Sequence, residues 1–327
     1  MYCLRRVGGQ RNGGVDVLRL LMALCVVINH SCILGHYFQN VLEMPVPVFL
    51  MLSGYFFNTD DSVKEKNKSK KQLIKIGKLT AFSYVFYIFW HIVWNLMHAK
   101  SLMLDYSTFY TCTNLFAPHI WYLHAYFLML CFVCLLHRFG FCFGKIRCRF
   151  LLFYIIISYL IFHISYIPPL IEKVFGYCLT FFLVGICIKR LTTNRTYSVA
   201  GMLLCLSLCG CILNQIFDID NIRYSFFTIM ASIFAVMVAI TLPIKTSNIF
   251  ARAGKNLSLY VYIFHWAVLD VINMYMVSNE CSRMLLYSKA ILLVMISLVV
   301  AFVFTKTETS KGKFSIEVQK FEGFQAL

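Results

Sequence analysis

The sequence predicts an all-α protein, a polytopic membrane helix bundle of about ten transmembrane helices with both termini in the cytoplasm. Of its 327 residues, 60% are hydrophobic and 13% are charged, and the mean hydropathy is +0.73. A soluble domain of this length could not cover so much apolar surface with so few charges. The apolar runs are continuous and do not alternate with polar residues, which favours helices over a barrel.

Ten apolar segments have about the length that a membrane-spanning helix needs, roughly 20 residues or somewhat fewer. The second has the weakest pattern, because Pro45 and Pro47 lie near its start. The expected spans are residues 17–35, 41–57, 79–97, 119–137, 150–166, 170–188, 197–217, 224–243, 257–277 and 284–304.

The distribution of basic residues predicts which side of the membrane each connection occupies. With the N-terminus inside, strict alternation places most of the 30 Lys and Arg residues in cytoplasmic segments, as the positive-inside rule requires. The net charge of +16 therefore reflects membrane topology and does not indicate a nucleic-acid partner. We expect a cytoplasmic tail over 1–16, a membrane domain over 17–304 and a second cytoplasmic tail over 305–327. The basic residues outside the cytoplasmic segments are Arg19, Lys100, Lys173, Arg223, Arg283 and Lys289.

The first apolar segment carries two side chains that hydrocarbon rejects, Arg19 and His30. Eleven residues separate them, which is about three helical turns, so both project from one face at a separation of roughly 16 Å. Arg keeps its charge, and His is the side chain best suited to move a proton near neutral pH. This shared face favours a functional pair over a snorkelling Arg and a His that only packs.

Polar or small residues interrupt three further apolar segments. Ser53 and Gly54 allow the close approach of another helix or of a ligand. His119 and Trp121, at the outer end of the fourth span, fit either a sugar site or an interfacial aromatic belt. His265 is expected near mid-membrane in the ninth span, where an imidazole needs a partner.

Two other features have alternative interpretations. The lysine-rich segment 58–78 is expected as a cytoplasmic loop that fixes topology or binds anionic lipid, or alternatively as a site for a polyanionic substrate. Cys131 and Cys134 have metal-ligand spacing, but they lie in an apolar segment with no second pair, so no metal is expected.

Several motifs, in order along the chain, resemble those of the acyltransferase family 3 membrane proteins, bacterial multi-span O-acyltransferases that modify polysaccharides. The first is Arg19 and His30 as R-x10-H, followed by PVFLMLSGY over residues 47–55. A basic stretch over 70–76 resembles the family's segment entering the third helix, although it has lysines where many members have arginines. HIWYL over 119–123 resembles the H-x-W-[FY]-L element, residues 176–190 resemble the family's sixth-helix region, and SLYVYIFH over 258–265 resembles a late s-x-Y-x-x-Y-x-x-H element.

The resemblance implies a membrane acyltransferase that moves an acyl group, acetyl above all, from acyl-CoA to a hydroxyl of a carbohydrate or cell-envelope acceptor. It implies His30 and Arg19 as catalytic residues and Lys75 as a residue that binds the coenzyme. Residues placed towards the substrate are Ser53, Gly54, His119, Trp121, Tyr262 and His265. It further implies O-acetylation as a polysaccharide modification, contact with membrane lipid, and a multi-pass location in the bacterial cytoplasmic (inner) membrane.

Two other functions fit parts of the same pattern. A transporter of a sugar or lipid-linked intermediate would also have about ten spans, prolines in a helix and intramembrane His residues. Such transporters often show internal duplication, and the sequence shows none. A family member that no longer catalyses is the other alternative, and the retention of R-x10-H and His265 argues against it.

Overall fold

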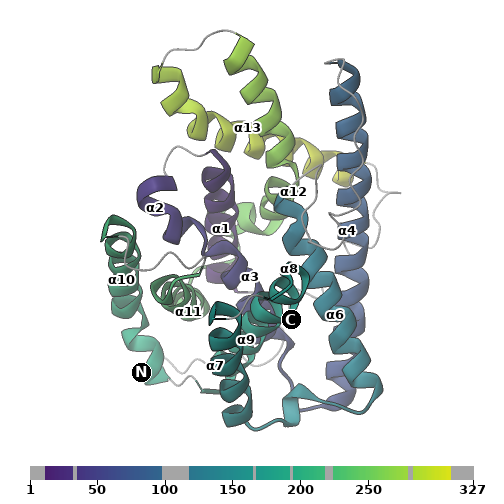
Figure 1. Cartoon of the computed structure of the whole chain (residues 1–327), viewed down its shortest axis with the longest axis vertical. Coiled ribbons are helices and arrows are strands. Elements are labelled where there is room, and N and C mark those ends of the chain that lie inside the picture. The colour runs from purple at the N-terminus through teal and green to yellow at the C-terminus, as the bar shows by residue number, and fades with distance from the viewer. Residues whose placement is uncertain are drawn as a thin grey trace. The chain divides into compact units, whose positions relative to one another are not determined.

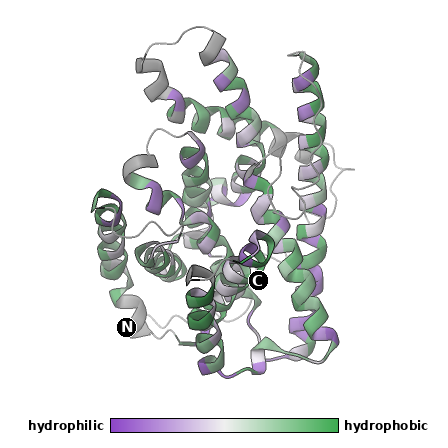
Figure 2. Cartoon of the chain, viewed as in Figure 1, coloured by the Kyte–Doolittle hydropathy of each residue, from purple (hydrophilic) through white to green (hydrophobic). Residues whose placement is uncertain are grey.

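The computed structural model describes residues 12–31, 35–97, 118–164, 167–191, 194–217, 224–278 and 283–310, and every regular element within these ranges is a helix (Figure 1). Most of this helical ribbon is hydrophobic (Figure 2). The prediction of an all-α membrane helix bundle is confirmed. The elements are α1 (Gly13–Ser31), α2 (Gly35–Leu42), α3 (Pro45–Phe57), α4 (Ser62–Met97), η1 (Pro118–Ile120), α6 (Trp121–Arg138), η2 (Phe143–Lys145), α7 (Cys148–Ile164), α8 (Pro169–Ile171), the π-helix η3 (Glu172–Leu179), α9 (Thr180–Leu191), α10 (Asn194–Phe217), α11 (Phe226–Thr241), α12 (Ile249–Ser278) and α13 (Arg283–Ser310).

Within the described residues, seven helical segments are long and apolar enough to cross a membrane, and three shorter apolar helices accompany them. Each of the ten overlaps one span expected from the sequence. The shorter ones are residues 148–161, 226–241 and 291–303. Most of both tails, residues 1–11 and 311–327, lies outside the described residues, and the cytoplasmic location of the termini stays a prediction.

Two segments differ from their expected form. The second span is divided, since α2 ends at Leu42, a turn follows, and α3 begins at Pro45, where a helix needs no N–H from its first residue. The lysine-rich segment is a helix and not a loop, because α4 begins at Ser62. Asp61 caps it by accepting hydrogen bonds from the backbone N–H groups of Val63 (2.9 Å) and Lys64 (3.1 Å).

The chain forms two compact units, which are described separately. The first comprises residues 1–48 and 193–327, and the second comprises residues 49–192.

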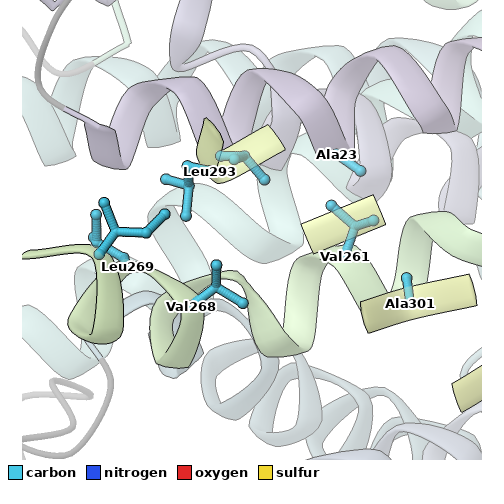
Figure 3. Close-up of a cluster of buried hydrophobic side chains, with 8 residues drawn as sticks. Ala23, Val261, Val268, Leu269, Leu293 and Ala301 are labelled. Carbon is cyan, nitrogen blue, oxygen red and sulfur yellow. The ribbon is translucent and has the colours of Figure 1, made fainter. Parts of the chain in front are cut away.

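In the first unit, α1 packs along α12, and α13 packs against both. Their shared core contains Ala23 and Val27 of α1, Val261 of α12, and Leu293 and Ala301 of α13, all with no exposed surface (Figure 3). A Cβ at Gly254 would overlap the carbonyl oxygen of Asp16, so α12 crosses α1 at van der Waals distance there.

In the second unit, α4 packs against α6, α6 against η3, and α7 against α9. Glycine also brings α3 and α9 together. A Cβ at Gly54 would overlap the carbonyl oxygen of Phe182, and a Cβ at Gly185 would overlap that of Met51. Of the two roles expected for Gly54, the structure therefore supports the close approach of a helix.

Candidate active site

The first unit places Arg19 and His30 on the same uninterrupted helix, α1. Three turns of α-helix separate them, which keeps the predicted spacing of roughly 16 Å. His30 lies in the last turn of α1, where its ring contacts two rings of α12. The two predicted catalytic residues therefore occupy different levels of one helix and have different surroundings.

His30 and His265 are brought together from positions 235 residues apart in the chain. Their rings stack with centroids 5.2 Å apart and an interplanar angle of 24°. Trp266 meets His30 edge-on, with a centroid distance of 5.1 Å and an angle of 82°. Two imidazolium ions at this distance would repel each other, so the pair can accept one proton more readily than two.

His265 is fully buried, and one of its ring nitrogens has a fixed role. Its Nδ1 lies 2.8 Å from the carbonyl oxygen of Tyr262. A carbonyl oxygen can only accept, so Nδ1 carries the proton and Nε2 is the basic nitrogen of the neutral ring. Tyr262, predicted to lie towards the substrate, thus orients His265 through its backbone, and its ring centroid lies 6.2 Å from that of His265.

Arg19 forms an ion pair that the sequence analysis did not identify. Its Nη1 lies 3.3 Å from Oδ1 of Asp16, one turn earlier on α1. The Asp16 side chain is 2% exposed and that of Arg19 is 34% exposed, so the pair anchors the guanidinium at one edge and leaves part of it accessible. The i,i+3 spacing of opposite charges was the sequence signal for this pair.

In the second unit, Ser53 belongs to a hydrogen-bonded group drawn from three helices. Gln72 of α4 donates through Nε2 to Ser53 Oγ and to the hydroxyl of Tyr126 of α6, and these two hydroxyls also bond to each other. Ser53 directly precedes Gly54, at which α3 meets α9, so its position is fixed both by this helix contact and by the hydrogen bonds. Gln72 lies in the basic stretch over 70–76, whose lysines and not this amide were singled out from the sequence, and Tyr126 belongs to no motif.

His119 in η1 and Trp121, the first residue of α6, have different surroundings. His119 is buried and meets the ring of Tyr87 edge-on, with centroids 5.3 Å apart. Trp121 is partly exposed, and the ammonium group of Lys173 lies 5.7 Å from the centroid of its ring. Only Trp121 of the two presents accessible surface.

Lys75 lies on a basic face of α4 that the helical structure creates. At about 100° per residue, five lysines fall within an arc of about 80°. They are Lys64, Lys68, Lys71, Lys75 and Lys78. The buried side of the same turns, which includes Glu65 and Ser69, points about 120° away from them.

The register of α4 against α6 determines which part of α6 this lysine face lies beside. Gly77 contacts the ring of Phe127, and the Thr80 hydroxyl lies 3.4 Å from the carbonyl oxygen of Leu123. Nearer the start of α4, Glu65 lies beside His137, with 3.6 Å between Oε1 and Nε2. The lysines of residues 68–78 therefore lie beside the apolar span of α6 and not beyond its end.

Glu65 is a buried carboxylate that sequence reasoning missed. It is 0% exposed and accepts hydrogen bonds from the backbone N–H groups of Phe143 and Gly144 and from the Cys142 thiol, each at 2.8 Å. Burial, together with the hydrogen bond to Glu65, raises the pKa of Cys142 and keeps the thiol protonated as a donor. In a lysine-rich helix a single Glu resembles a solvent-exposed partner, so only the fold reveals its role.

The end of α3 is held by cations from α4 and α9. Arg190 donates through Nε (3.0 Å) and Nη2 (2.8 Å) to Oδ1 of Asn58, and also to the carbonyl oxygens of Phe143 and Ile146. Lys189 donates to the Asn58 carbonyl oxygen at 2.9 Å, and Lys68 to that of Phe56 at 3.1 Å. Cations near the final carbonyl groups of a helix stabilise it.

The predicted residues are distributed over both units. His30, His265 and Tyr262 meet in the first unit, with Arg19 three turns away. Ser53, Gly54, His119, Trp121 and Lys75 lie in the second unit, where Ser53 bonds to Gln72, about one turn before Lys75 on α4. Among the described residues, no three His, Cys, Asp or Glu side chains gather as a metal site would require.

Comparison with models of protein families gives a match. The family model Acyl_transf_3, described as an acyltransferase domain, matches residues 12–306. No curated protein and no solved structure matched the chain. The match covers α1 to α13 and includes every predicted site residue, so this chain belongs to acyltransferase family 3 and is a membrane acyltransferase.

Proposed function

We propose that this acyltransferase moves an acetyl group from acetyl-CoA to a hydroxyl of a carbohydrate or other cell-envelope acceptor, in the inner membrane of a bacterium. The observation that carries the proposal is the pairing of His30 with His265. Transfer to a hydroxyl needs a base that removes the hydroxyl proton. A His pair with one ring held by a backbone carbonyl supplies a base in a fixed orientation.

His30 is the proposed proton-transfer group. It takes the hydroxyl proton as the acceptor oxygen attacks the acyl carbonyl, and it returns a proton to the departing coenzyme thiolate. His265, stacked on His30 and fixed through Tyr262, orients that ring. Negative charge develops on the carbonyl oxygen during the attack, and a positive group stabilises it. Arg19, held by Asp16 with part of its surface accessible, is the proposed cation that meets either this oxygen or the donor's pyrophosphate.

The lysine face of α4, which includes Lys75, is the proposed site for the phosphates of the donor. Charged side chains at the depth of a membrane span face water or protein and avoid lipid. Four of the five face lysines, those within residues 68–78, lie beside the apolar span of α6, and together they would attract a ligand with several negative charges. Acyl-CoA, with its three phosphate groups, fits this requirement.

The reaction is tested with membranes containing the protein, radiolabelled acetyl-CoA and an envelope extract. We expect release of free CoA that depends on the extract, and we expect the label in a glycan fraction. Membranes without the protein provide the background, and omission of the extract measures hydrolysis of the donor. If labelled substrate exchanges across the membrane while no CoA is released, the protein transports and does not acylate.

Replacing Lys75 with glutamine is expected to raise the KM for acetyl-CoA about five- to tenfold, because one charge-assisted contact to phosphate is lost. The kcat should change less, since Lys75 does not contact the reacting carbonyl. Lys66→Gln is the matched control, because Lys66 is an exposed lysine on nearly the opposite side of the same helix. Equal effects of the two substitutions would refute the assignment of Lys75.

A further inference from the structure

The hydrogen-bonded group of Ser53, Gln72 and Tyr126 has one more hydrogen atom than its contacts use. The amide nitrogen and the two hydroxyl oxygens contact one another in every combination. The amide supplies one hydrogen to each hydroxyl, and the contact between the hydroxyls needs a third. If the amide oxygen faced the hydroxyls instead, both hydroxyl hydrogens would point at it and the contact between them would have none. One of the two hydroxyl groups therefore keeps a hydrogen for a further acceptor.

Burial determines which hydroxyl keeps this hydrogen. Tyr126 is 4% exposed, whereas Ser53 is partly exposed. A buried hydroxyl hydrogen without an acceptor is unfavourable, because the group has given up its hydrogen bonds to water. Tyr126 therefore donates to Ser53, and Ser53 keeps a hydrogen that it can donate outside the group.

Ser53 differs from serines that bond to the backbone of their own helix. Ser69 donates to the carbonyl oxygen of Lys66 at 2.8 Å, and Ser232 donates to that of Thr228 at 2.7 Å. Within the part of the chain that the structure describes, the hydroxyl of Ser53 bonds to Gln72 and Tyr126 alone. Its remaining hydrogen is thus available to a ligand, and the two neighbours hold the oxygen in place.

This hydroxyl lies beside the lysine face of α4. Gln72, which bonds to Ser53, has Lys68 one turn before it and Lys75 one turn after it. Residues three or four positions apart are neighbours on a helix surface, so the group adjoins these lysines. Because the three side chains of the group are uncharged, a phosphate is attracted to the lysines, and Ser53 suits a neutral acceptor that is bound next to them.

We propose that Ser53 donates a hydrogen bond to an amide carbonyl oxygen in the pantetheine arm of the acyl donor, and that Gln72 and Tyr126 are positioning residues for this hydroxyl. The inference rests on the proposed use of acyl-CoA, with its phosphates on the lysine face. In coenzyme A the arm leads away from the phosphates and carries its amide groups before the thiol. An amide carbonyl is therefore the neutral acceptor that this donor brings next to a row of lysines.

Two ligands separate the arm from the phosphates. CoA has both, whereas the adenosine bisphosphate that corresponds to its nucleotide end has phosphates and no arm. Their Kd values are measured with the purified protein in detergent. Ser53→Ala is expected to raise the Kd of CoA about three- to tenfold, the usual contribution of one hydrogen bond, and to leave the Kd of the bisphosphate unchanged.

Two further variants of serine serve as controls. Ser53→Thr keeps a hydroxyl and should bind CoA nearly as tightly as the unaltered protein. Ser69→Ala removes a serine hydroxyl that donates to its own helix, and it should leave both Kd values unchanged.

The positioning role is tested with Tyr126→Phe, which removes the phenol and keeps the ring. We expect the Kd of CoA to rise about threefold, and we expect no further rise when Tyr126→Phe is added to Ser53→Ala, because Tyr126 acts through Ser53. Additive effects in the double variant would show that Tyr126 does not orient Ser53 and would overturn its assignment.

An unchanged Kd of CoA in Ser53→Ala would overturn the contact with the arm. An equal rise for both ligands would also overturn it, since a general loosening of the second unit affects the phosphates as well. Release of CoA in the transfer assay tests the proposed function separately. If the ligands bind as expected and no CoA is released, the transfer reaction fails and the contact with the arm holds. If the unaltered protein binds neither ligand, the assignment of the donor fails and this inference fails with it.

Discussion

Replacing His30 with alanine is expected to lower the rate of acyl transfer by a factor of about 10² to 10⁴, the usual contribution of a positioned acid–base group. The loss should appear in kcat, because His30 acts on the proton that moves in the transition state and not on the binding of the donor. It is measured as CoA release by membranes matched for the amount of inserted protein.

A second intramembrane His provides the control for this substitution. His91 of α4 lies 2.8 Å from Asn95 through Nε2 and belongs to no motif, so His91→Ala should retain activity. His265→Ala should lower the rate as well, because His30 would lose the ring on which it stacks. Full activity of correctly inserted His30→Ala protein would remove His30 from the mechanism.

The features that could be predicted from the sequence are those that depend on residues close together in the chain. Continuous apolar runs predicted ten helices that the structure contains, and the R-x10-H spacing predicted that Arg19 and His30 share a helix. The start of α4 at Ser62 was also predictable in principle, because Asp61 is a favourable N-cap residue. Its two hydrogen bonds from the backbone lower the pKa of Asp61, as expected for a carboxylate that caps a helix.

The features that the sequence could not predict depend on contacts between distant segments. Nothing around His265 indicates that its ring will stack on His30, and nothing around Glu65 indicates that it will be buried under the loop that begins at Cys142. The π-helix depends on hydroxyl groups of α7, which no pattern in residues 172–179 reveals. The position of the lysine face beside α6 depends on the register of α4 against α6, which no local pattern in the sequence reveals.

Replacing Glu65 with alanine is expected to destabilise the second unit by about 3 to 5 kcal/mol, the usual cost of removing one partner from a buried, hydrogen-bonded charge network. The substitution leaves the backbone N–H groups of Phe143 and Gly144 buried without their acceptor, at about 1 to 3 kcal/mol each. Glu65→Gln should also destabilise the second unit. One carboxylate oxygen would become an amide NH₂ group, which cannot accept the hydrogen bond that this oxygen now accepts. The midpoint of thermal unfolding in detergent measures the effect.

Lys66→Ala is the matched control, because it removes an exposed side chain at the next position of the same helix and should leave the midpoint nearly unchanged. An unchanged midpoint in Glu65→Ala would show that the buried contacts of this carboxylate do not stabilise the fold. The loop that Glu65 holds also supplies the Phe143 carbonyl oxygen to Arg190, which in turn binds Asn58 at the end of α3. Because α3 carries Ser53, loosening of this loop should lower acyl transfer at temperatures below the unfolding midpoint, whereas a substitution that affects only global stability would leave the rate unchanged until unfolding begins.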